Sequence, residues 1–369
     1  MEWIVPGWLM VQLLGLGALV WAGGRRLKKP SAPAAVAAWP AVSVVAPIKG
    51  LPPDAGAGLR SILAQDYPDA EFLLVTEDEN DPSVPLVRDC LAGARGRHVV
   101  AGRASACGQK NFSLLAGVRA SDPGRPVLVF CDAGHTAPPD WLQKLVAPLA
   151  AGETGIATGY HFVYPRPPSV PVAGRAITVL LLHLLQQIPG LTQPWGGAIA
   201  MTRALFEKLK LDEFWSRQVV DDVSLAVLLN RNGIPARPAP EALSRTVLEA
   251  ESWAEWSDWL TRQLFYLKLY FPVSWCFGGL LGYGMAVFLL ICPFSAIGAM
   301  PWALLLLLIA AMRTFHPSPG PLGRWMAGGV AAVFMACACH LRTLFMRRLV
   351  WRGIVYEIGR DGTVRVTEP

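Results

Sequence analysis

The sequence predicts a membrane-anchored α/β protein, in which a doubly wound parallel sheet lies between apolar helices. Of the 369 residues, 53% are hydrophobic and 16% are charged, and the mean hydropathy is +0.37. This composition is too apolar for an ordinary soluble enzyme. Two long uncharged stretches, 3–24 and 269–312, indicate where the chain enters a membrane. Between them, strand-like and helix-like segments alternate, which is the pattern of a parallel sheet covered by helices.

The first apolar segment, residues 1–24, is predicted to be a transmembrane helix. It has no charged residue between Trp3 and Gly24. The length of this uncharged stretch matches the ~20 residues that cross a bilayer. Four basic residues follow at once and favour a cytosolic location for what comes next: Arg25, Arg26, Lys28 and Lys29. A cleaved signal peptide would carry its basic residues before the apolar run, so this segment is expected to stay as an anchor.

Residues 25–251 are predicted to form one cytosolic α/β domain. Strands are expected at 41–47, 71–78, 98–102 and 126–132, and helices at 55–68, 84–93 and 110–121. Ligands of such sheets bind beyond the carboxyl ends of the strands. Acidic residues occur at these ends: Glu77, Asp78 and Asp81 after the second strand, and Asp132 after the fourth.

The C-terminal third is predicted to return the chain to the membrane. Residues 252–270 form an aromatic-rich helix at the interface, and 271–341 form a membrane region. Its uncharged part can hold a hairpin of two spans of about 20 residues each. The apolar run 325–341 contains His340 and fits either a third crossing or an interfacial helix. The basic tail, 342–369, favours the cytosol, a location that a third crossing would contradict.

Cysteine spacing and net charge exclude several classes of protein. The seven cysteines contain no CxxC pair, which argues against a disulfide framework and against structural zinc. The net charge of +6 is concentrated beside the apolar segments, where anionic lipid is the expected partner. No nucleic acid partner is therefore expected, and the oligomeric state is left open.

In the stretch VLVFCDAGHTAPPDW, residues 127–141, Asp132 places a carboxylate at the end of a predicted buried strand. Small residues, Ala133 and Gly134, leave space beside Asp132. Such a carboxylate could hold a divalent cation that a diphosphate shares. Because Asp before Gly is also common in plain turns, the stretch alone leaves both interpretations open.

Three further positions are candidates for ligand contacts. Asp221 and Asp222 begin an apolar-periodic helix, where acids also occur simply because they complement the helix dipole. Trp195 precedes Gly196 and a second glycine, which suggests backbone that approaches a ligand closely. Lys110 begins a predicted helix, either as a solvated residue or as a cation directed at phosphate.

Taken together, these motifs resemble the ceramide glucosyltransferases, which are membrane enzymes with the glycosyltransferase-A fold. The resemblance spans nearly the whole chain, including the C-terminal VWRGIVYEIGRDGTVRV. It implies a Rossmann-like catalytic domain that transfers a hexose, most often glucose, from a UDP-sugar to the hydroxyl of a membrane lipid such as ceramide. The similar segments, in order, are VSVVAPIKG, SILAQDYPDAEFLLVTEDENDP, GQKNFSLLAGV, FCDAGHTAPPD, TQPWGGAIAMTR, VVDDVSLA and RQLFY.

The resemblance implies a role for each separated aspartate. Asp81, helped by Asp78, would contact the nucleoside of the donor. Asp132 would hold Mg²⁺ or Mn²⁺ on the diphosphate. Asp222 would be the general base that deprotonates the acceptor hydroxyl, with Asp221 beside it.

This sequence differs from the family's final motif, which is Gln or Arg followed after two residues by Arg-Trp. The motif aligns with Arg262, Phe265 and Tyr266, so one cation near the leaving group is missing. Arg262 and Gln263 are the expected substitutes, and Tyr266 takes the place of the tryptophan in substrate binding. Lys110, Trp195 and Gly196 complete the predicted substrate contacts.

With one base and no evident covalent nucleophile, inversion at the anomeric carbon is expected. Other acceptors fit the same motifs: a polyprenyl phosphate, a hopanoid or a diacylglycerol. A processive polysaccharide synthase would need an intact final motif and more spans, and a non-catalytic scaffold would not need three aspartates. The amino-acid composition is rich in Ala, Gly, Pro and Arg, which suggests a bacterial source. The expected location is then the inner membrane, with the catalytic domain in the cytosol.

Overall fold

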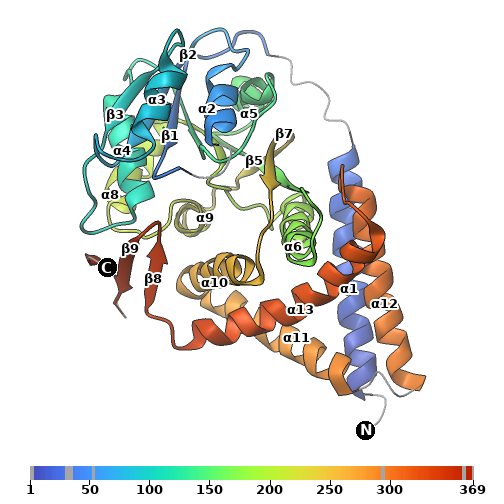
Figure 1. The fold of residues 1–369 in the computed structure, drawn as a ribbon. Coiled ribbons are helices and arrows are strands. Elements are labelled where there is room, and N and C mark those ends of the chain that lie inside the picture. Colours follow the sequence, from blue (N-terminus) through green and yellow to red (C-terminus); the bar gives the residue numbers. More distant parts are fainter. Residues whose placement is uncertain (1–3, 30–35, 52–54, 292–295, 360–362, 368–369) are drawn as a thin grey trace. The chain divides into compact units, whose positions relative to one another are not determined.

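The computed structural model describes residues 4–29, 36–51, 55–291, 296–359 and 363–367 (Figure 1). The chain divides into two compact units that each draw on separate parts of the sequence. The sheet unit comprises residues 31–161, 192–246 and 347–369, and the helical unit comprises 1–30, 162–191 and 247–346.

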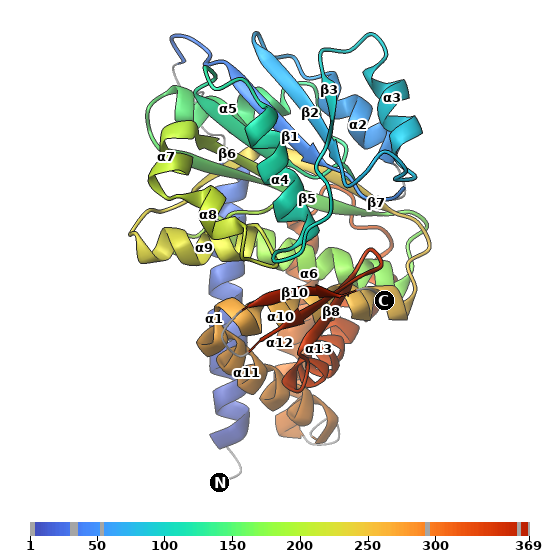
Figure 2. The ribbon, with the colours of Figure 1, turned by 90° about the vertical axis from the view of Figure 1, so that its left-hand side faces the viewer.

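A seven-stranded sheet with the order β3-β2-β1-β4-β6-β5-β7 forms the centre of the sheet unit (Figure 2). β1 pairs in parallel with both β2 and β4, and β2 pairs in parallel with β3, as the alternating pattern predicted. β6, however, runs antiparallel to β4 and to β5, so the sheet is mixed. The strands are β1 (Val42–Pro47), β2 (Ala70–Thr76), β3 (Arg97–Val100), β4 (Val127–Cys131), β5 (Ile156–Pro165), β6 (Ala198–Thr202) and β7 (Arg237–Leu248).

The antiparallel half of the sheet has a topological cause. A parallel connection needs a crossover that returns along the face of the same sheet, usually through a helix. The helix between β5 and β6, α6 (Val170–Gln186), belongs to the helical unit, and the chain re-enters the sheet in the opposite direction. Alternation of strands and helices in the sequence does not reveal this change of direction.

Helices cover both faces of the sheet because alternate strand residues point to opposite sides. Val44 and Leu74 belong to one buried cluster, with α2 (Ala55–Leu63), α3 (Val84–Leu91) and α5 (Trp141–Ala150). Val45 and Val75 belong to the other. That second cluster includes residues of α4 (Gln109–Ala120), α7 (Arg203–Lys208), α8 (Leu211–Trp215) and α9 (Asp222–Arg231).

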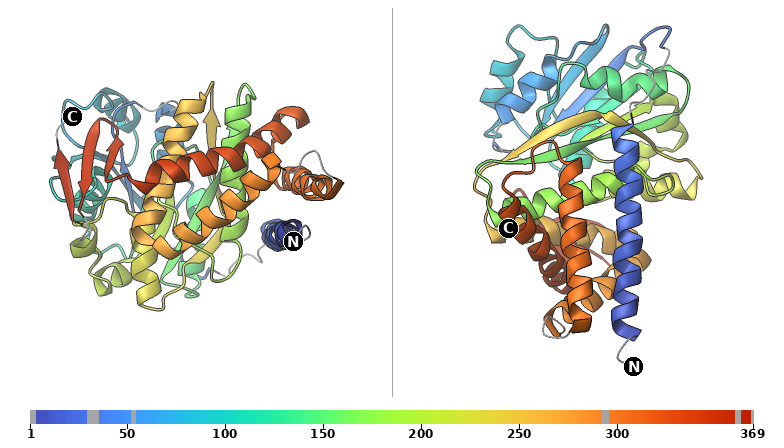
Figure 3. Two further views of the ribbon diagram at one scale, coloured as in Figure 1. Left: turned by 90° about the horizontal axis from the view of Figure 1, so that it is seen from below. Right: turned by 90° about the vertical axis from the view of Figure 1, so that its right-hand side faces the viewer.

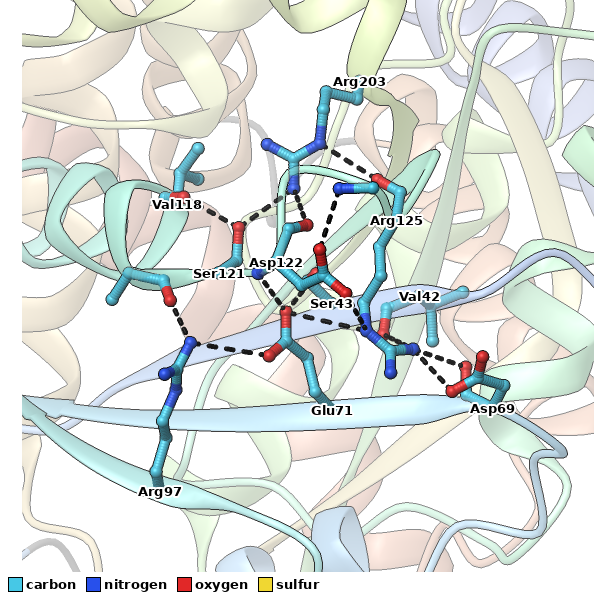
Figure 4. Close-up of polar contacts among 12 residues, drawn as sticks. Val42, Ser43, Asp69, Glu71, Arg97, Val118, Ser121, Asp122, Arg125 and Arg203 are labelled. Carbon is cyan, nitrogen blue, oxygen red and sulfur yellow. Dashed lines mark hydrogen bonds and ion pairs between the residues drawn. The ribbon is translucent and has the colours of Figure 1, made fainter.

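Charged side chains are collected at the amino ends of β1 and β2, centred on Glu71 (Figure 4). Glu71 Oε1 accepts hydrogen bonds from Ser43 Oγ (2.7 Å) and from the backbone N–H of Asp122 (2.8 Å). Arg125 Nη1 lies 2.7 Å from Asp69 Oδ1. These groups satisfy one another and tie the strand starts together. They lie at the opposite ends of the strands from the acids expected to bind ligand. We therefore infer that they stabilise the fold and do not bind the ligand.

Three short strands within 348–358 and 364–367 form a small antiparallel sheet where a basic tail was expected. In β9 the residues Ile354, Tyr356 and Ile358 alternate with less buried ones, so one face of this sheet is apolar. Its edge meets the loop before α4, where the N–H of Val366 donates to Ser105 O (3.3 Å). The strands are β8 (Arg348–Trp351), β9 (Ile354–Ile358) and β10 (Val364–Thr367), in the order β10-β9-β8.

Within the part that the structure describes, the helical unit contains three helices that are long and apolar enough to cross a membrane, at residues 7–28, 272–290 and 322–344. The apolar stretch predicted as a hairpin is divided between two of its helices, α11 and α12. α1 and α12 lie side by side, whereas α13 runs obliquely to them and across α6 (Figure 3). The helices besides α6 are α1 (Ile4–Lys28), α10 (Trp253–Tyr270), α11 (Pro272–Ile291), α12 (Ala296–Met312) and α13 (Leu322–Leu344), with a 3₁₀ turn at Arg313–Phe315.

Glycines allow α13, α6 and α10 to pack closely. A Cβ on Gly328 of α13 would lie 2.6 Å from the backbone nitrogen of Gly174 and 2.8 Å from Ala173 Cβ on α6. A Cβ on Gly174 would lie 2.3 Å from the ring of Trp256 on α10. Small residues at helix crossings permit the close backbone approach that stabilises helix pairs in membranes.

A buried ion pair joins the start of α10 to α6. The guanidinium of Arg175 pairs with Glu251, which precedes α10, and lies 4.5 Å from the ring centre of Trp259. Ser252 and Glu255 form a capping box at the first turn of α10. The aromatic helix predicted from the sequence therefore begins at a defined position on α6.

We expect Gly328→Ala to destabilise the helical unit. Alanine improves helix propensity by about 0.5–1 kcal/mol, but overpacking a close contact costs about 1–3 kcal/mol, so the steric cost should dominate. Thermal unfolding in detergent micelles measures the result. Gly323→Ala on the same helix is the control, because a Cβ there meets nothing within 4 Å, and it should unfold no earlier than wild type. Equal behaviour of the two variants would contradict the proposed packing.

Candidate active site

One lysine brings together carboxylates from two distant segments of the sheet unit. Lys110 Nζ lies 2.8 Å from Asp132 Oδ1 and 2.9 Å from Asp221 Oδ2. It also donates to the backbone carbonyl of Gly196 (3.2 Å). The side chain of Lys110 is 19% exposed, that of Asp221 only 2% and that of Asp132 34%, so solvent screens the pair of Lys110 and Asp221 least.

Lys110 is held in place by the start of α4. Gly108 donates its N–H to Gln218 O (2.8 Å), and Asn111 Nδ2 donates to the same carbonyl (3.1 Å). A Cβ on Gly108 would lie 2.2 Å from Val219 O, so only glycine allows this approach. The beginning of α4 is thus fixed directly against the segment that leads into Asp221.

The C-terminal sheet supports α4 from another direction. The N–H of Gln109, at the first position of the helix, donates to the hydroxyl of Tyr356 (3.1 Å), which satisfies one of the unpaired groups of a helix start. The Gln109 side chain accepts from Ala104 N (2.9 Å) and donates to Gly102 O (2.9 Å). Tyr356 is 1% exposed, and burial raises its pKa to about 12. The last strands of the chain therefore help to position Lys110.

Asp222 has a different environment from its neighbour Asp221. Its Oδ2 accepts the N–H of Gly196 (2.9 Å), and its Oδ1 accepts the N–H of Val223 (2.7 Å). Burial and the charge of Asp221 raise the pKa of Asp222 to about 6, against the opposing effects of Lys110 and the two N–H groups. Asp222 is thus the carboxylate that can exchange a proton near neutral pH.

The backbone of Gly196 lies close against the charged groups. A Cβ at this position would lie 2.5 Å from Asp221 Oδ2 and 2.6 Å from Lys110 Nζ. The sequence predicted that the glycine pair allows backbone to approach a ligand. In the structure, Gly196 approaches the ion pair itself and donates its N–H to Asp222.

The cluster holds more negative than positive charge. Lys110 is one ammonium among three carboxylates: Asp132, Asp221 and Asp222. Burial, the largest single effect, would raise the pKa of Asp132, but Lys110 and His135 together outweigh it and hold that pKa well below its usual range. The same carboxylates raise the pKa of Lys110 despite its burial. A cation is therefore electrostatically favoured beside the cluster.

An aromatic wall that the sequence did not reveal lies beside the carboxylates. The rings of Trp195 and His161 are stacked, with centroids 4.5 Å apart and an interplanar angle of 2°. His135 and Tyr160 pack against Trp195 at 5.1 and 5.3 Å. Burial raises the pKa of Tyr160, and the charge of nearby Asp222 adds to the effect. The sequence had singled out Trp195 of this wall, and the position of His135, three residues after Asp132, was a second signal.

The predicted nucleoside contacts lie at the ends of β1 and β2. Asp81 is buried and accepts hydrogen bonds from Gly50 N (3.0 Å), Ser83 N (2.9 Å) and Ser83 Oγ (2.6 Å). Its carboxylate thus shapes the loop after β1 and the start of α3. Asp78 is exposed and accepts the N–H of Asn80 (2.6 Å). Contact of either aspartate with a nucleoside stays a prediction.

The residues of the divergent final motif lie on α10, in the helical unit. Phe265 and Tyr266 are 1% and 8% exposed, whereas Arg262 and Gln263 are half-buried. Phe265, the replacement for the family's arginine, therefore serves as a buried apolar residue. The substrate-binding roles of Arg262, Gln263 and Tyr266 stay predictions.

Comparisons with known proteins bear on the family and on the fold. Residues 8–169 match the model of glycosyl transferase family 21, which confirms the resemblance drawn from the motifs over this part of the chain. Among solved structures, the chain is similar to the mannosyltransferase PcManGT from Pyrobaculum calidifontis in complex with GDP-Man and Mn²⁺. The TM-score is 0.54 at 19% identity, over 91% of this chain and 98% of that chain. The predicted glycosyltransferase-A fold is thereby confirmed.

A second similar structure is glucosyl-3-phosphoglycerate synthase from Mycobacterium tuberculosis in complex with Mn²⁺, UDP and glucosyl-3-phosphoglycerate. Its TM-score is 0.39 at 17% identity, over 65% of this chain and 84% of that chain. The family match and the fold together support a glycosyltransferase, that is, an enzyme of sugar transfer.

We expect Lys110→Met to destabilise the sheet unit, most strongly at neutral pH. Removing one partner of a buried ion pair costs about 3–5 kcal/mol, and the partial exposure of Asp132 reduces this to about 2–3 kcal/mol. Because Lys110 lowers the pKa of Asp132 in the folded state, its contribution is present above about pH 4, the pKa of an unfolded aspartate, and is lost as pH falls further. Denaturant unfolding in EDTA, at several pH values, measures this difference.

Lys144→Met is the matched control for this prediction. Lys144 Nζ lies 2.7 Å from Asp140 Oδ2, but both side chains are a third or more exposed. Exposed pairs contribute about 0–1 kcal/mol, so this variant should stay close to wild type at every pH. A loss of stability in Lys110→Met that does not depend on pH would contradict the electrostatic role of Lys110.

Proposed function

We propose that the protein is an inverting, metal-dependent glycosyltransferase that transfers a hexose, glucose first among them, from a UDP-sugar to the hydroxyl of a membrane lipid such as ceramide. The observation that carries the proposal is the placement of Lys110 between Asp132 and Asp221, with Asp222 joined to the same cluster through Gly196. The family match and the fold support sugar transfer, and the apolar helices support an acceptor in the bilayer.

Asp222 is the general base in this proposal. The charge of Asp221 is offset by Lys110 at 2.9 Å, whereas Asp222 is held by two N–H groups and has a pKa near 6. A base with such a pKa is mostly ionised at neutral pH and still accepts a proton effectively. Proton removal from a lipid hydroxyl by a positioned base contributes roughly 10²- to 10⁴-fold to the rate.

The transfer step exchanges one bond at the anomeric carbon for another. The acceptor oxygen forms its bond to that carbon from the face opposite the diphosphate, while the bond between the carbon and the diphosphate oxygen breaks. The hydroxyl proton moves to Asp222, and the electron pair leaves with UDP. Lys110 would stabilise the negative charge that develops on the departing diphosphate.

The residues around Asp132 suit a divalent cation, Mg²⁺ or Mn²⁺. Lys110 occupies Oδ1 of this carboxylate, while Oδ2 faces His135. Among the residues that the structure describes, no three His, Cys, Asp or Glu side chains converge as a complete metal site. A cation held here would keep positions for diphosphate oxygens, and it would supply Lewis-acid stabilisation of the leaving group.

The proposed location is the bacterial inner membrane, with the sheet unit in the cytosol. The basic residues at the end of α1, Arg25, Arg26 and Lys28, support this orientation. In this proposal, residues 1–24 anchor the chain, 25–251 carry the catalytic site, and 271–341 form the membrane region. The aromatic helix 252–270 would guide the acceptor, with Arg262 and Gln263 replacing the missing cation of the family motif.

Membranes that contain the protein should form a glycolipid from a UDP-sugar and Mg²⁺ or Mn²⁺. The measurement is mass spectrometry of lipid products from a panel of UDP-sugars, with GDP-mannose included. Asp222→Asn should lower the rate at least about 100-fold because the base is lost. Asp212→Asn, at an exposed position of α8, is the control and should keep wild-type activity.

Two outcomes would count against the proposal. No product from any donor, with wild type and Asp222→Asn indistinguishable, would contradict transfer altogether. A product whose formation Asp222→Asn hardly slows would indicate transfer to a phosphate acceptor, such as a polyprenyl phosphate, which needs less help from a base.

The pH dependence of kcat/KM should report the protonation of Asp222. The base must be ionised, and its pKa is raised to about 6, so kcat/KM should fall about tenfold per pH unit below 6 and level off above it. Lys110 lowers the pKa of Asp222, so any residual activity of Lys110→Met should have its acid limb at higher pH than wild type. An acid limb that stays in place in Lys110→Met would contradict this electrostatic coupling.

A further inference from the structure

Asp132 faces a histidine that the transfer step above does not use. The distance between His135 Nε2 and Asp132 Oδ2 is 3.7 Å, while Asp132 Oδ1 is occupied by Lys110. We propose that His135 Nε2 and Asp132 Oδ2 together bind the catalytic divalent cation, as a mixed nitrogen and oxygen pair that prefers Mn²⁺ over Mg²⁺. This inference rests on the proposed function only for the identity of the diphosphate that completes the site.

The separation of the two atoms fits a shared ion. At 3.7 Å the pair is too long for a hydrogen bond. Two donor atoms that each lie about 2.1 Å from one metal ion are roughly 3 to 4 Å apart, depending on the angle between them. The observed distance is within this range, so a cation could enter between the two atoms with little movement of either side chain.

The other nitrogen of His135 is already hydrogen-bonded. Its Nδ1 lies 2.7 Å from Thr246 Oγ1, and that hydroxyl lies 2.6 Å from His161 Nδ1. A hydroxyl has one proton to donate, so it can donate to one ring and accept from the other. If Nδ1–H of His135 donates to Thr246, the Nε2 lone pair is left facing Asp132. Metal-binding histidines are oriented by this kind of second hydrogen bond.

The backbone around His135 is fixed as well. Thr136 and Arg245 form an isolated β-bridge, with N···O distances of 3.0 and 2.8 Å. On the other side, a Cβ on Gly58 of α2 would lie 2.3 Å from Ala133 O and 3.0 Å from His135 O, so α2 packs directly on this loop. Both ligands therefore stand on a rigid segment, as a preorganised metal site requires.

The backbone between the two proposed ligands is not crowded. A Cβ placed on Gly134, between the two proposed ligands in sequence, would meet nothing within 4 Å. The three carboxylates of the cluster exceed the single ammonium of Lys110, which favours a dication over a second monovalent group. Two protein ligands would leave the remaining positions to diphosphate oxygens and water.

The ligand types determine the preferred metal. Mg²⁺ takes oxygen ligands and loses its waters reluctantly, whereas Mn²⁺, which also favours oxygen ligands, accepts an imidazole nitrogen more readily than Mg²⁺ does. A pair made of a carboxylate oxygen and an imidazole nitrogen should therefore bind Mn²⁺ more tightly than Mg²⁺. Replacement of His135 by aspartate would make both ligands oxygen and should shift the preference toward Mg²⁺.

The test is pulsed electron paramagnetic resonance of Mn²⁺ bound to the full-length protein in detergent micelles, with inorganic pyrophosphate and a nitrogen-free buffer. Wild type should show coupling of Mn²⁺ to a histidine ¹⁴N nucleus, and His135→Gln should lose it. His161→Gln is the control from the same cluster and should retain the coupling. In parallel, metal titration should show that the ratio of Mn²⁺ to Mg²⁺ affinity falls at least about tenfold in His135→Asp.

Several results would overturn the inference. They are bound Mn²⁺ without ¹⁴N coupling in wild type, coupling that survives in His135→Gln, an unchanged affinity ratio in His135→Asp, and no detectable Mn²⁺ binding. The wild-type spectrum alone decides the matter if a variant fails to fold. Glycolipid formation with an Mn²⁺ site that has only oxygen ligands would refute the role of His135 and leave the proposed function intact. Histidine-bound Mn²⁺ without product from any donor would support the role of His135 and contradict the proposed function.

Discussion

The ammonium of Lys110 is the interaction on which the candidate site depends. It lies within 3 Å of Asp132 and Asp221, two carboxylates that would otherwise repel each other. Because the same group donates to Gly196, it also fixes the backbone whose N–H holds Asp222. A single positive charge thus sets the spacing of the groups assigned to the leaving group and to the acceptor.

The fold supports this lysine from two sides that are far apart in the sequence. Gly108 and Asn111 bind the carbonyl of Gln218, so the start of α4 cannot shift without moving the approach to Asp221. Tyr356 holds the first N–H of the same helix from the C-terminal sheet. The C-terminal sheet, which follows the apolar helices in sequence, is therefore part of the framework that positions Lys110.

Environment, more than residue type, separates the chemical roles of the acids. Asp221 and Asp222 are adjacent in sequence, yet one is neutralised by Lys110 and the other receives two N–H groups and retains a pKa near 6. Asp132 differs again, because it shares its two oxygens between an ammonium and an imidazole. These differences support one carboxylate as base, one as the partner of Lys110 and one as a metal ligand.

The sequence by itself determined the features that local pattern encodes. Apolar runs of bilayer length, the strands around β1, β2 and β4, and an aspartate at the end of β4 all follow from periodicity and residue type. The antiparallel return of β6, the folding of residues 348–367 and the placement of Lys110 against Asp221 required the tertiary structure. These features depend on contacts between residues that are often more than 80 positions apart. The raised pKa of Asp222 and the pairing of His135 with Thr246 depend on the tertiary structure in the same way. Local pattern carries no information on such contacts, because they arise only when distant segments pack.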